Sequence, residues 1–227
     1  MSQAVMLMAI REGLSFDELN KLYVEEKEGD LRSMPFEQFF GEMGISKQQK
    51  DKRVETAEDI KAFILIALRE MYYEMHEGEY GEYNPTETIR EGYRSLLDRL
   101  AIPLTAMFAA LHPEEVATEV VSATTNHPED PYFFSEDRAT LIAENEANSI
   151  WNDSEFQDAI MTGKTNKTWH AIIDNRTRDT HRATDGTTIP IMDAFWVGDS
   201  LLLFPRDESL GSSADEIVNC RCWLTYS

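Results

Sequence analysis

The stretch that decides the fold of the C-terminal part is KTWHAIIDNRTRDTHRATDG, residues Lys167–Gly186. Alternation over residues 168–173 predicts a β-strand with Trp169, Ala171 and Ile173 on one face. A single strand cannot bury that face by itself, so the pattern requires further strands to pair with it.

Turn signals and charges follow the strand. Asp174-Asn175 interrupts the alternation, residues 179–183 predict a short turn or helix, and Asp185-Gly186 predicts a hairpin-type turn because glycine tolerates a positive φ. The charged residues here are Asp174, Arg176, Arg178, Asp179, Arg182 and Asp185. They form either an ion-pair network that fixes an irregular loop or a charged recognition or catalytic cleft. We favour the network, because structural ion-pair networks are common.

Short β-rich runs continue to the C-terminus. TTIPIM, SLLLFP and CRCWLTY are rich in β-branched, aromatic or leucine residues and are separated by turn signals. They predict short antiparallel strands, so the fold class is α+β, with a mostly helical N-terminal part before a small α+β domain. We expect a helical acidic domain over residues 1–130, and a domain of one long helix and a small sheet over 131–227.

Helical signals fill the first two-thirds of the chain. Ser15 and Glu18 have the spacing of a capping box, and Gly44 and Gly78 are expected stops. A first helix is predicted to start at Ser15, a short second one follows Pro35, and two longer helices cover 56–77 and 86–101. Two short helices are predicted at 104–111 and 114–123, separated at Pro113. The last predicted helix is long and runs from near Ser135 to Asn152 or beyond.

The formal net charge of −21 is concentrated in the helical part. Residues 160–227 hold 7 Lys+Arg and 9 Asp+Glu, which leaves 14 and 33 for residues 1–159, a net charge of −19. Such a surface repels nucleic acid, and it suits a basic protein partner or simply a solvated surface. No apolar run approaches a membrane span, and the N-terminus lacks a basic region before its apolar residues, so we expect no membrane contact and no signal peptide.

The two cysteines, Cys220 and Cys222, are one residue apart. A disulfide between them would close a small, strained ring, so a reducing compartment fits the chain. Strand alternation puts both thiols on one face, with Arg221 and Trp223 on the other.

Two states are open for these thiols. In the first, thiolates about 6–7 Å apart along a strand converge on zinc, with His181 as third ligand and Asp185, His170 or water as fourth. In the second, the thiols pack as small hydrophobic groups and His181 hydrogen-bonds a carboxylate or carbonyl. We favour the metal-free state, because one Cys-x-Cys with one histidine lacks the redundancy of most structural zinc sites.

These residues, taken together, resemble the C-terminal domain of the phage Mu F-like minor head protein family, over about residues 136–226. The matching motif consists of Glu146, Lys167, Trp169, Asp174, Arg176, Arg178, His181, Asp185, Gly186, Asn219, Cys220 and Cys222, and Phe204-Pro205 and Glu216 also match. Three positions depart from the family pattern. Glu144 and Asn145 replace its basic residue and threonine, and Arg206 replaces its glycine after the proline.

The resemblance implies a low-copy phage head protein at the portal vertex that acts in head assembly, DNA packaging or DNA ejection. It implies the portal protein as partner, with the scaffold or major capsid protein as further candidates and packaged DNA contacted only indirectly. It also implies a location in the virion head, assembled in the host cytoplasm, and no catalytic activity or cofactor. Some relatives carry a fused toxin domain, and because this sequence stops at Ser227 we expect none here.

Two other functions are weighed against a head protein. A small nuclease or transferase would use His181 as general acid/base and Arg176 or Arg178 on a phosphate. The sequence offers no glycine-rich phosphate loop, no motif of paired catalytic carboxylates and no Ser-His-Asp arrangement in support of it. An acidic mimic of DNA would explain the charge of −19 but not the C-terminal motif.

Overall fold

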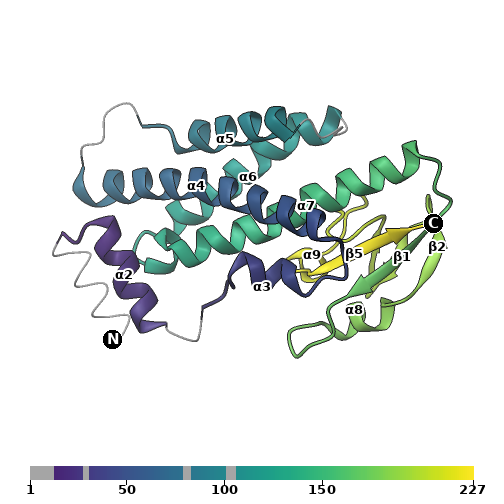
Figure 1. Cartoon of the computed structure of the whole chain (residues 1–227). Coiled ribbons are helices and arrows are strands. Elements are labelled where there is room, and N and C mark those ends of the chain that lie inside the picture. Colours follow the sequence, from purple (N-terminus) through teal and green to yellow (C-terminus); the bar gives the residue numbers. More distant parts are fainter. Residues whose placement is uncertain (1–12, 28–30, 79–82, 101–105) are drawn as a thin grey trace. The chain divides into compact units, whose positions relative to one another are not determined.

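The computed structural model describes residues 13–27, 31–78, 83–100 and 106–227 (Figure 1). The chain forms two compact units. Of the described residues, unit 1 comprises 13–27, 31–34, 58–78, 83–100 and 106–143, and unit 2 comprises 35–57 and 144–227. This grouping joins residues 35–57 to the C-terminal part, which the local sequence pattern did not indicate. Separate folding of 1–130 and 131–227 stays a prediction.

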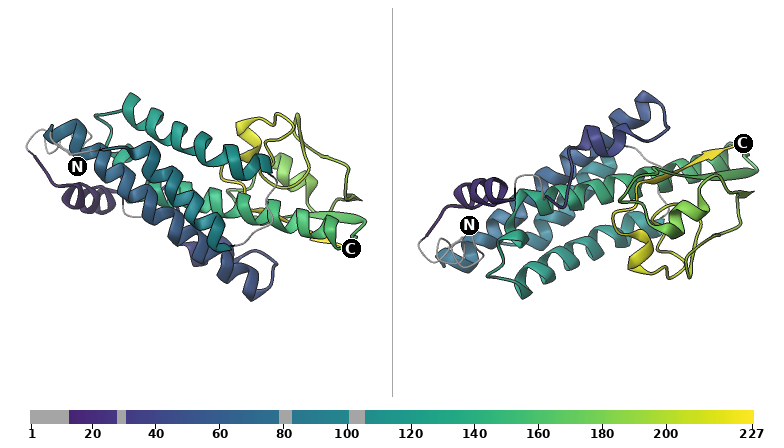
Figure 2. Two further views of the ribbon diagram at one scale, coloured as in Figure 1. Left: turned by 90° about the horizontal axis from the view of Figure 1, so that it is seen from above. Right: turned by 90° about the horizontal axis from the view of Figure 1, so that it is seen from below.

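Unit 1 is helical, as both views of Figure 2 show. Its elements are α2 (Phe16–Glu26), α5 (Pro85–Leu100), α6 (Ala106–Asn126), the 3-10 helix η1 (Pro131–Phe134), and the adjoining parts of α4 (Lys47–Glu77) and α7 (Glu136–Met161). The predicted capping box at the start of α2 is confirmed, because Ser15 accepts from the backbone of Glu18 and the Glu18 carboxylate accepts from Ser15. Among the described residues no helix is long and apolar enough to cross a membrane.

Aromatic side chains form much of the core of unit 1. Tyr72 is buried with its ring 5.9 Å from that of Phe16 and 5.5 Å from that of Phe134, and its hydroxyl donates to the carbonyl of Leu14 at 2.6 Å. Edge-to-face pairs of this kind add stability beyond the area that they bury. Phe16, Tyr72 and Phe134 are therefore core residues of unit 1.

Two predicted helix boundaries were wrong. α4 begins at Lys47 rather than near residue 56, and Ser46 and Gln49 form a capping box before it. A serine followed three residues later by glutamine is a local sequence signal for the start of a helix. α6 is one helix through Pro113 rather than two. A proline in a helix removes one hydrogen bond, and burial of Val116, Ala117 and Val120 just beyond it favours continuing the helix.

Unit 2 contains the sheet. Its helices are α3 (Phe36–Gly41), α8 (Asp179–Thr184) and α9 (Ala214–Ile217), together with the adjoining parts of α4 and α7. Its strands are β1 (Asn166–Ala171), β2 (Thr188–Pro190), β3 (Phe195–Val197), β4 (Ser200–Leu202) and β5 (Cys222–Tyr226). β1 lies between β2 and β5 and pairs antiparallel with both, and β3 and β4 form a separate antiparallel pair. The expected α+β fold with short antiparallel strands is confirmed.

One face of the three-stranded sheet forms the core that holds the site. Trp169 and Ala171 on β1 point into it, together with Phe195, Val197, Leu202, Cys220, Cys222 and Leu224. Ile173 was expected on this face, but β1 ends at Ala171 and Ile173 is 51 % exposed. On the other face, Trp223 stacks on His170 and approaches Gly44, where a Cβ would lie 3.0 Å from the indole.

Candidate functional site

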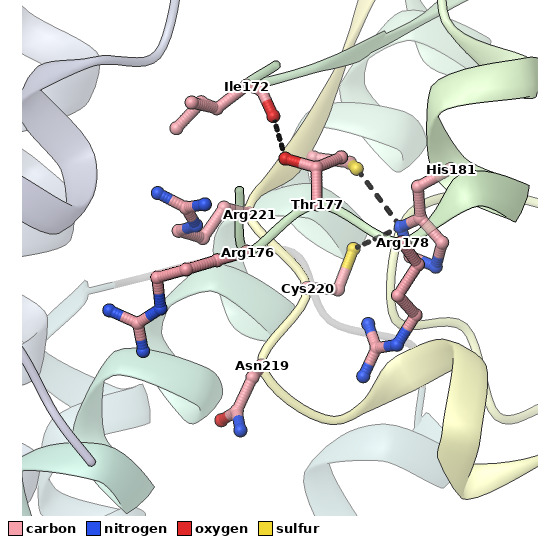
Figure 3. Close-up of a pocket in the computed structure, with 9 residues that line it drawn as sticks. Ile172, Arg176, Thr177, Arg178, His181, Asn219, Cys220 and Arg221 are labelled. Carbon is pink, nitrogen blue, oxygen red and sulfur yellow. Dashed lines mark hydrogen bonds between the residues drawn. The ribbon is translucent and has the colours of Figure 1, made fainter. Parts of the chain in front are cut away.

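His181, Cys220 and Cys222 converge in the core of unit 2 (Figure 3). The Nδ1 atom of His181 lies 3.3 Å from Sγ of Cys222 and 3.6 Å from Sγ of Cys220. The three candidate ligand atoms lie within 4.8 Å of one another, and each of the three residues is at least 98 % buried. The structure thus places the three residues named from the sequence in one tight trio.

Three elements deliver these side chains. His181 comes from α8, Cys220 from the turn after α9, and Cys222 from the first position of β5. Cys222 pairs with Ala171 across the sheet, which sets its side chain on the same face as Trp169. The Trp169 ring stands edge-on to the His181 ring at 5.9 Å and closes the core side of the trio.

Neither of the two side chains expected as a fourth ligand belongs to the trio. The Asp185 carboxylate accepts a hydrogen bond from the backbone N–H of Ala171 at 2.8 Å and so fixes the turn at Gly186, whose φ is +76°. His170 shares a hydrogen bond with Thr225 and stacks on Trp223. Both rings lie on the face of the sheet opposite to the core that holds the trio. The carboxylate nearest to the imidazole belongs to Glu216 instead.

Glu216 orients the imidazole of His181. Its Oε2 atom lies 3.1 Å from Nε2 of His181 and accepts a hydrogen bond from the Thr180 hydroxyl at 2.8 Å. Gly198 makes room for this carboxylate, because a Cβ there would lie 2.3 Å from Glu216 Oε1. With one ring nitrogen on Glu216, the other is directed at the two sulfurs. In the sequence, Glu216 matches the family pattern, but nothing in its local pattern indicates that it binds His181.

Burial and mutual hydrogen bonds shift the pKa of each residue in the trio. Burial acts to lower the pKa of His181, but its hydrogen bond to Cys220 and the charge on that sulfur outweigh burial and raise it. Burial acts to raise the pKa of Cys220, but hydrogen bonds from Cys222 and His181 hold it well below its usual value. Burial and the neighbouring Cys220 raise the pKa of Cys222. Of the two thiols, Cys220 is therefore the one that loses its proton more readily.

Asparagine side chains on α7 fix the backbone of the Cys-x-Cys segment. The Asn148 amide donates to the carbonyls of Cys220 and Cys222 at 3.0 and 3.4 Å. The Asn152 amide donates to the Cys222 carbonyl at 3.2 Å, and Asn145 accepts from the backbone N–H of Asn219 at 2.8 Å. Sequence reasoning missed this stripe, although the spacing 145, 148, 152 places three amides on one helix face.

Two of the departures from the family pattern contact each other. Arg206 has a φ of +71°, which explains why glycine suits this position, since only glycine adopts such angles without strain. Its guanidinium donates to the side chain of Asn145 and, at 3.1 Å, to the carbonyl of Ile217, and it lies 3.9 Å from the Glu146 carboxylate. Asn145 and Arg206, which both depart from the family pattern in the sequence, are therefore hydrogen-bonded to each other in the structure.

The charged segment after β1 is held by hydrogen bonds to backbone carbonyls and by an ion pair with Arg221 outside it, and an ion-pair network within the segment stays a prediction. Arg221 Nη2 contacts both carboxylate oxygens of Asp174 at 2.6 Å. Arg182 donates to the carbonyl of Asp174 at 2.6 Å, and Arg178 donates to the carbonyl of Val218. The Asp174 carboxylate also accepts from the backbone N–H of Arg176 at 2.9 Å.

Lys167 is buried away from the trio. Its ammonium donates to the carbonyl of Leu203 at 2.6 Å and lies 4.6 Å from the ring centre of Phe156. Burial lowers the pKa of Lys167 to about 8, against the opposing influence of Asp207 and Asp193. This motif residue therefore supports packing rather than the chemistry of the trio.

A small cavity borders the trio. Its volume is about 10 Å³, and its lining residues are Ile172, Arg176, Thr177, Arg178, His181, Asn219, Cys220, Arg221 and Cys222. That volume accommodates about one water molecule. Chemically, the arrangement can hold a soft metal ion or a shared set of protons, and it offers a place for one solvent molecule beside it.

Comparison with known proteins shows the family to which this chain belongs. The family profile described as Phage Mu protein F like protein matches residues 108–225, more than half of the chain, so the chain belongs to that family. It is therefore a phage head morphogenesis protein and is virion-associated. The match begins earlier than the resemblance read from the motif, within α6. No curated protein and no solved structure matched the chain.

Proposed function

We propose that this protein is a minor head protein that binds the portal protein and acts in head assembly, DNA packaging or DNA ejection. Family membership carries this proposal. In the structure, residues of the family motif form one framework: Trp169 and Cys222 lie in the sheet core, while Asn219 binds Asn145 and Asp174 pairs with Arg221 in the loops around it. A framework of this kind presents a stable surface to a partner.

A non-enzymatic role is part of the proposal. His181 is 2 % exposed, and both of its ring nitrogens already face partners. A general acid/base must reach the proton that it transfers, and a cavity for about one water does not admit a phosphodiester. These observations favour a structural role over a nuclease or transferase.

Acidity also bears on the partners. The net charge of −19 over residues 1–159 disfavours direct contact with packaged DNA and suits a basic protein surface. The portal protein is the first candidate for that surface, followed by the scaffold and major capsid proteins.

Co-expression tests this proposal. The full chain should elute with the portal protein in size-exclusion chromatography, should not elute with an unrelated acidic protein, and should be found in purified proheads by quantitative mass spectrometry. Absence from both proheads and mature heads, together with no binding to portal protein, would contradict it. DNA cleavage by wild-type protein that is lost in His181→Gln would favour the nuclease instead.

A further inference from the structure

We propose that His181, Cys220 and Cys222 bind one zinc ion, with a water or hydroxide from the adjacent cavity as fourth ligand. This inference concerns the purified chain alone and does not depend on its role in the head. It reverses the metal-free state that the sequence favours, and the reason is the geometry of the trio.

The distances fit a metal centre. For Zn–S and Zn–N bonds of about 2.3 and 2.0 Å in a tetrahedron, the sulfur–nitrogen separation is about 3.5 Å. The observed separations from Nδ1 of His181 are 3.3 Å to Cys222 and 3.6 Å to Cys220, on either side of that value. Thiolate and imidazole ligands in this number select zinc among the common divalent ions of the cell.

The surroundings of the trio are those of a ligand set held in place. Histidines that bind metals usually donate their second N–H to a carboxylate, and Nε2 of His181 has Glu216 at 3.1 Å. The Asn148 and Asn152 amides bind the carbonyls of the Cys-x-Cys segment, so both sulfurs come from a fixed backbone. Ligands positioned in this way lose little freedom when a metal binds.

A second observation points to a ligand at the sulfurs. The indole Nε1 of fully buried Trp169 makes no hydrogen bond of ordinary geometry to a described residue. Trp169 and Cys222 lie in one buried cluster, on the same face of the paired strands β1 and β5. Donation to a metal-bound thiolate would give this buried N–H a partner, and N–H donors to ligating sulfurs are a general feature of such centres.

The open side of the trio determines the coordination type. The cavity of about 10 Å³ has room for about one water, and no other carboxylate or imidazole of the described residues joins the three ligand atoms. Three protein ligands and one solvent molecule complete a tetrahedron. Two thiolates neutralise the divalent ion, which makes its burial tolerable.

Metal analysis of the purified full chain tests the inference. The protein is prepared without chelator and without a metal-binding tag, and it should contain about one zinc per chain. Cys222→Ser and His181→Gln should lose the zinc and melt at a lower temperature. His170→Gln is the matched control, because His170 points away from the trio, and it should keep both the zinc and the melting temperature.

A cobalt titration keeps the test valid if the variants fail to fold. Chelator-treated wild-type protein should bind one equivalent of Co²⁺ with the visible absorption of a tetrahedral thiolate complex, and zinc should displace it. Glu216→Gln should retain the one-to-one stoichiometry with affinity about 10–100-fold weaker, as expected for a positioning residue. Metal-free wild-type protein with reduced thiols, no cobalt absorption and no thermal response to zinc would overturn the proposal. Stoichiometric iron or copper would overturn the assignment to zinc.

Discussion

Replacing Trp169 with alanine should be among the most damaging single changes in unit 2. Of the described residues it is the largest with a fully buried side chain, and it contacts Phe195 at 5.2 Å between ring centres. A buried tryptophan removes about 200 Å² from water, and at about 25 cal/mol per Å² its loss costs about 5 kcal/mol. Measured truncations of large aromatics give about 3–5 kcal/mol, so we expect about 4 kcal/mol.

Trp196 provides a matched control within the same small domain. It is 69 % exposed on β3, so Trp196→Ala should change stability by less than about 0.5 kcal/mol. Urea unfolding followed by far-ultraviolet circular dichroism compares the two variants with the parent. For a chain of this length, the expected loss in Trp169→Ala corresponds to a fall in Tm of about 8–16 °C.

A milder variant covers the case in which the alanine protein does not fold. Trp169→Phe keeps an aromatic ring in the core and should lose less than half as much stability. If the free energies of unfolding of Trp169→Ala and Trp196→Ala differ by less than about 0.5 kcal/mol, the assignment of Trp169 to the core of the sheet is refuted.

Three further predictions follow from the buried polar groups of unit 2. The pKa of Lys167 in the folded protein is about 8, below the value of about 10.4 in an unfolded chain, so the unfolded state binds the proton more tightly. The free energy of unfolding should therefore rise by about 1.4 kcal/mol from pH 7 to 9. Urea titrations of Lys167→Met should show no such rise. Asn145→Thr and Arg206→Gly restore the residues of the family pattern. A double-mutant cycle of the free energy of unfolding in urea should show a coupling of about 0.5–3 kcal/mol between them. Strictly additive effects would mean that the hydrogen bond between Arg206 and Asn145 contributes nothing. Asn148→Leu leaves the carbonyl of Cys220 without this donor and should cost about 1–3 kcal/mol in thermal unfolding; an unchanged Tm would show that the amide is dispensable.

Local signals in the sequence determined much of the secondary structure. The capping box of Ser15 and Glu18 starts α2, and the apolar alternation in β1 places Trp169 and Ala171 on the buried face. The turn at Asp185-Gly186 has the expected positive φ. Each of these features depends on residues within a few positions of one another, so the sequence states them directly.

Local signals also failed where a distant contact overrides them. Residues 47–55 are too polar to suggest a helix that packs, yet Arg53 is fully buried because its guanidinium pairs with Glu155 at 2.9 Å. An Arg–carboxylate pair makes burial of a polar helix face tolerable, and this partner lies 102 residues away in the chain.

The candidate site required the tertiary structure. The sequence by itself put Cys220 and Cys222 on one face and named His181 as a third candidate, but it could not say whether the imidazole reaches the sulfurs. That distance depends on the pairing of β1 with β5 and on how α8 packs against β1 and β3, which are long-range arrangements. Spacing along a chain constrains only neighbouring residues, whereas convergence of groups about 40 residues apart is decided by which strands pair and which side chains fill the core between them.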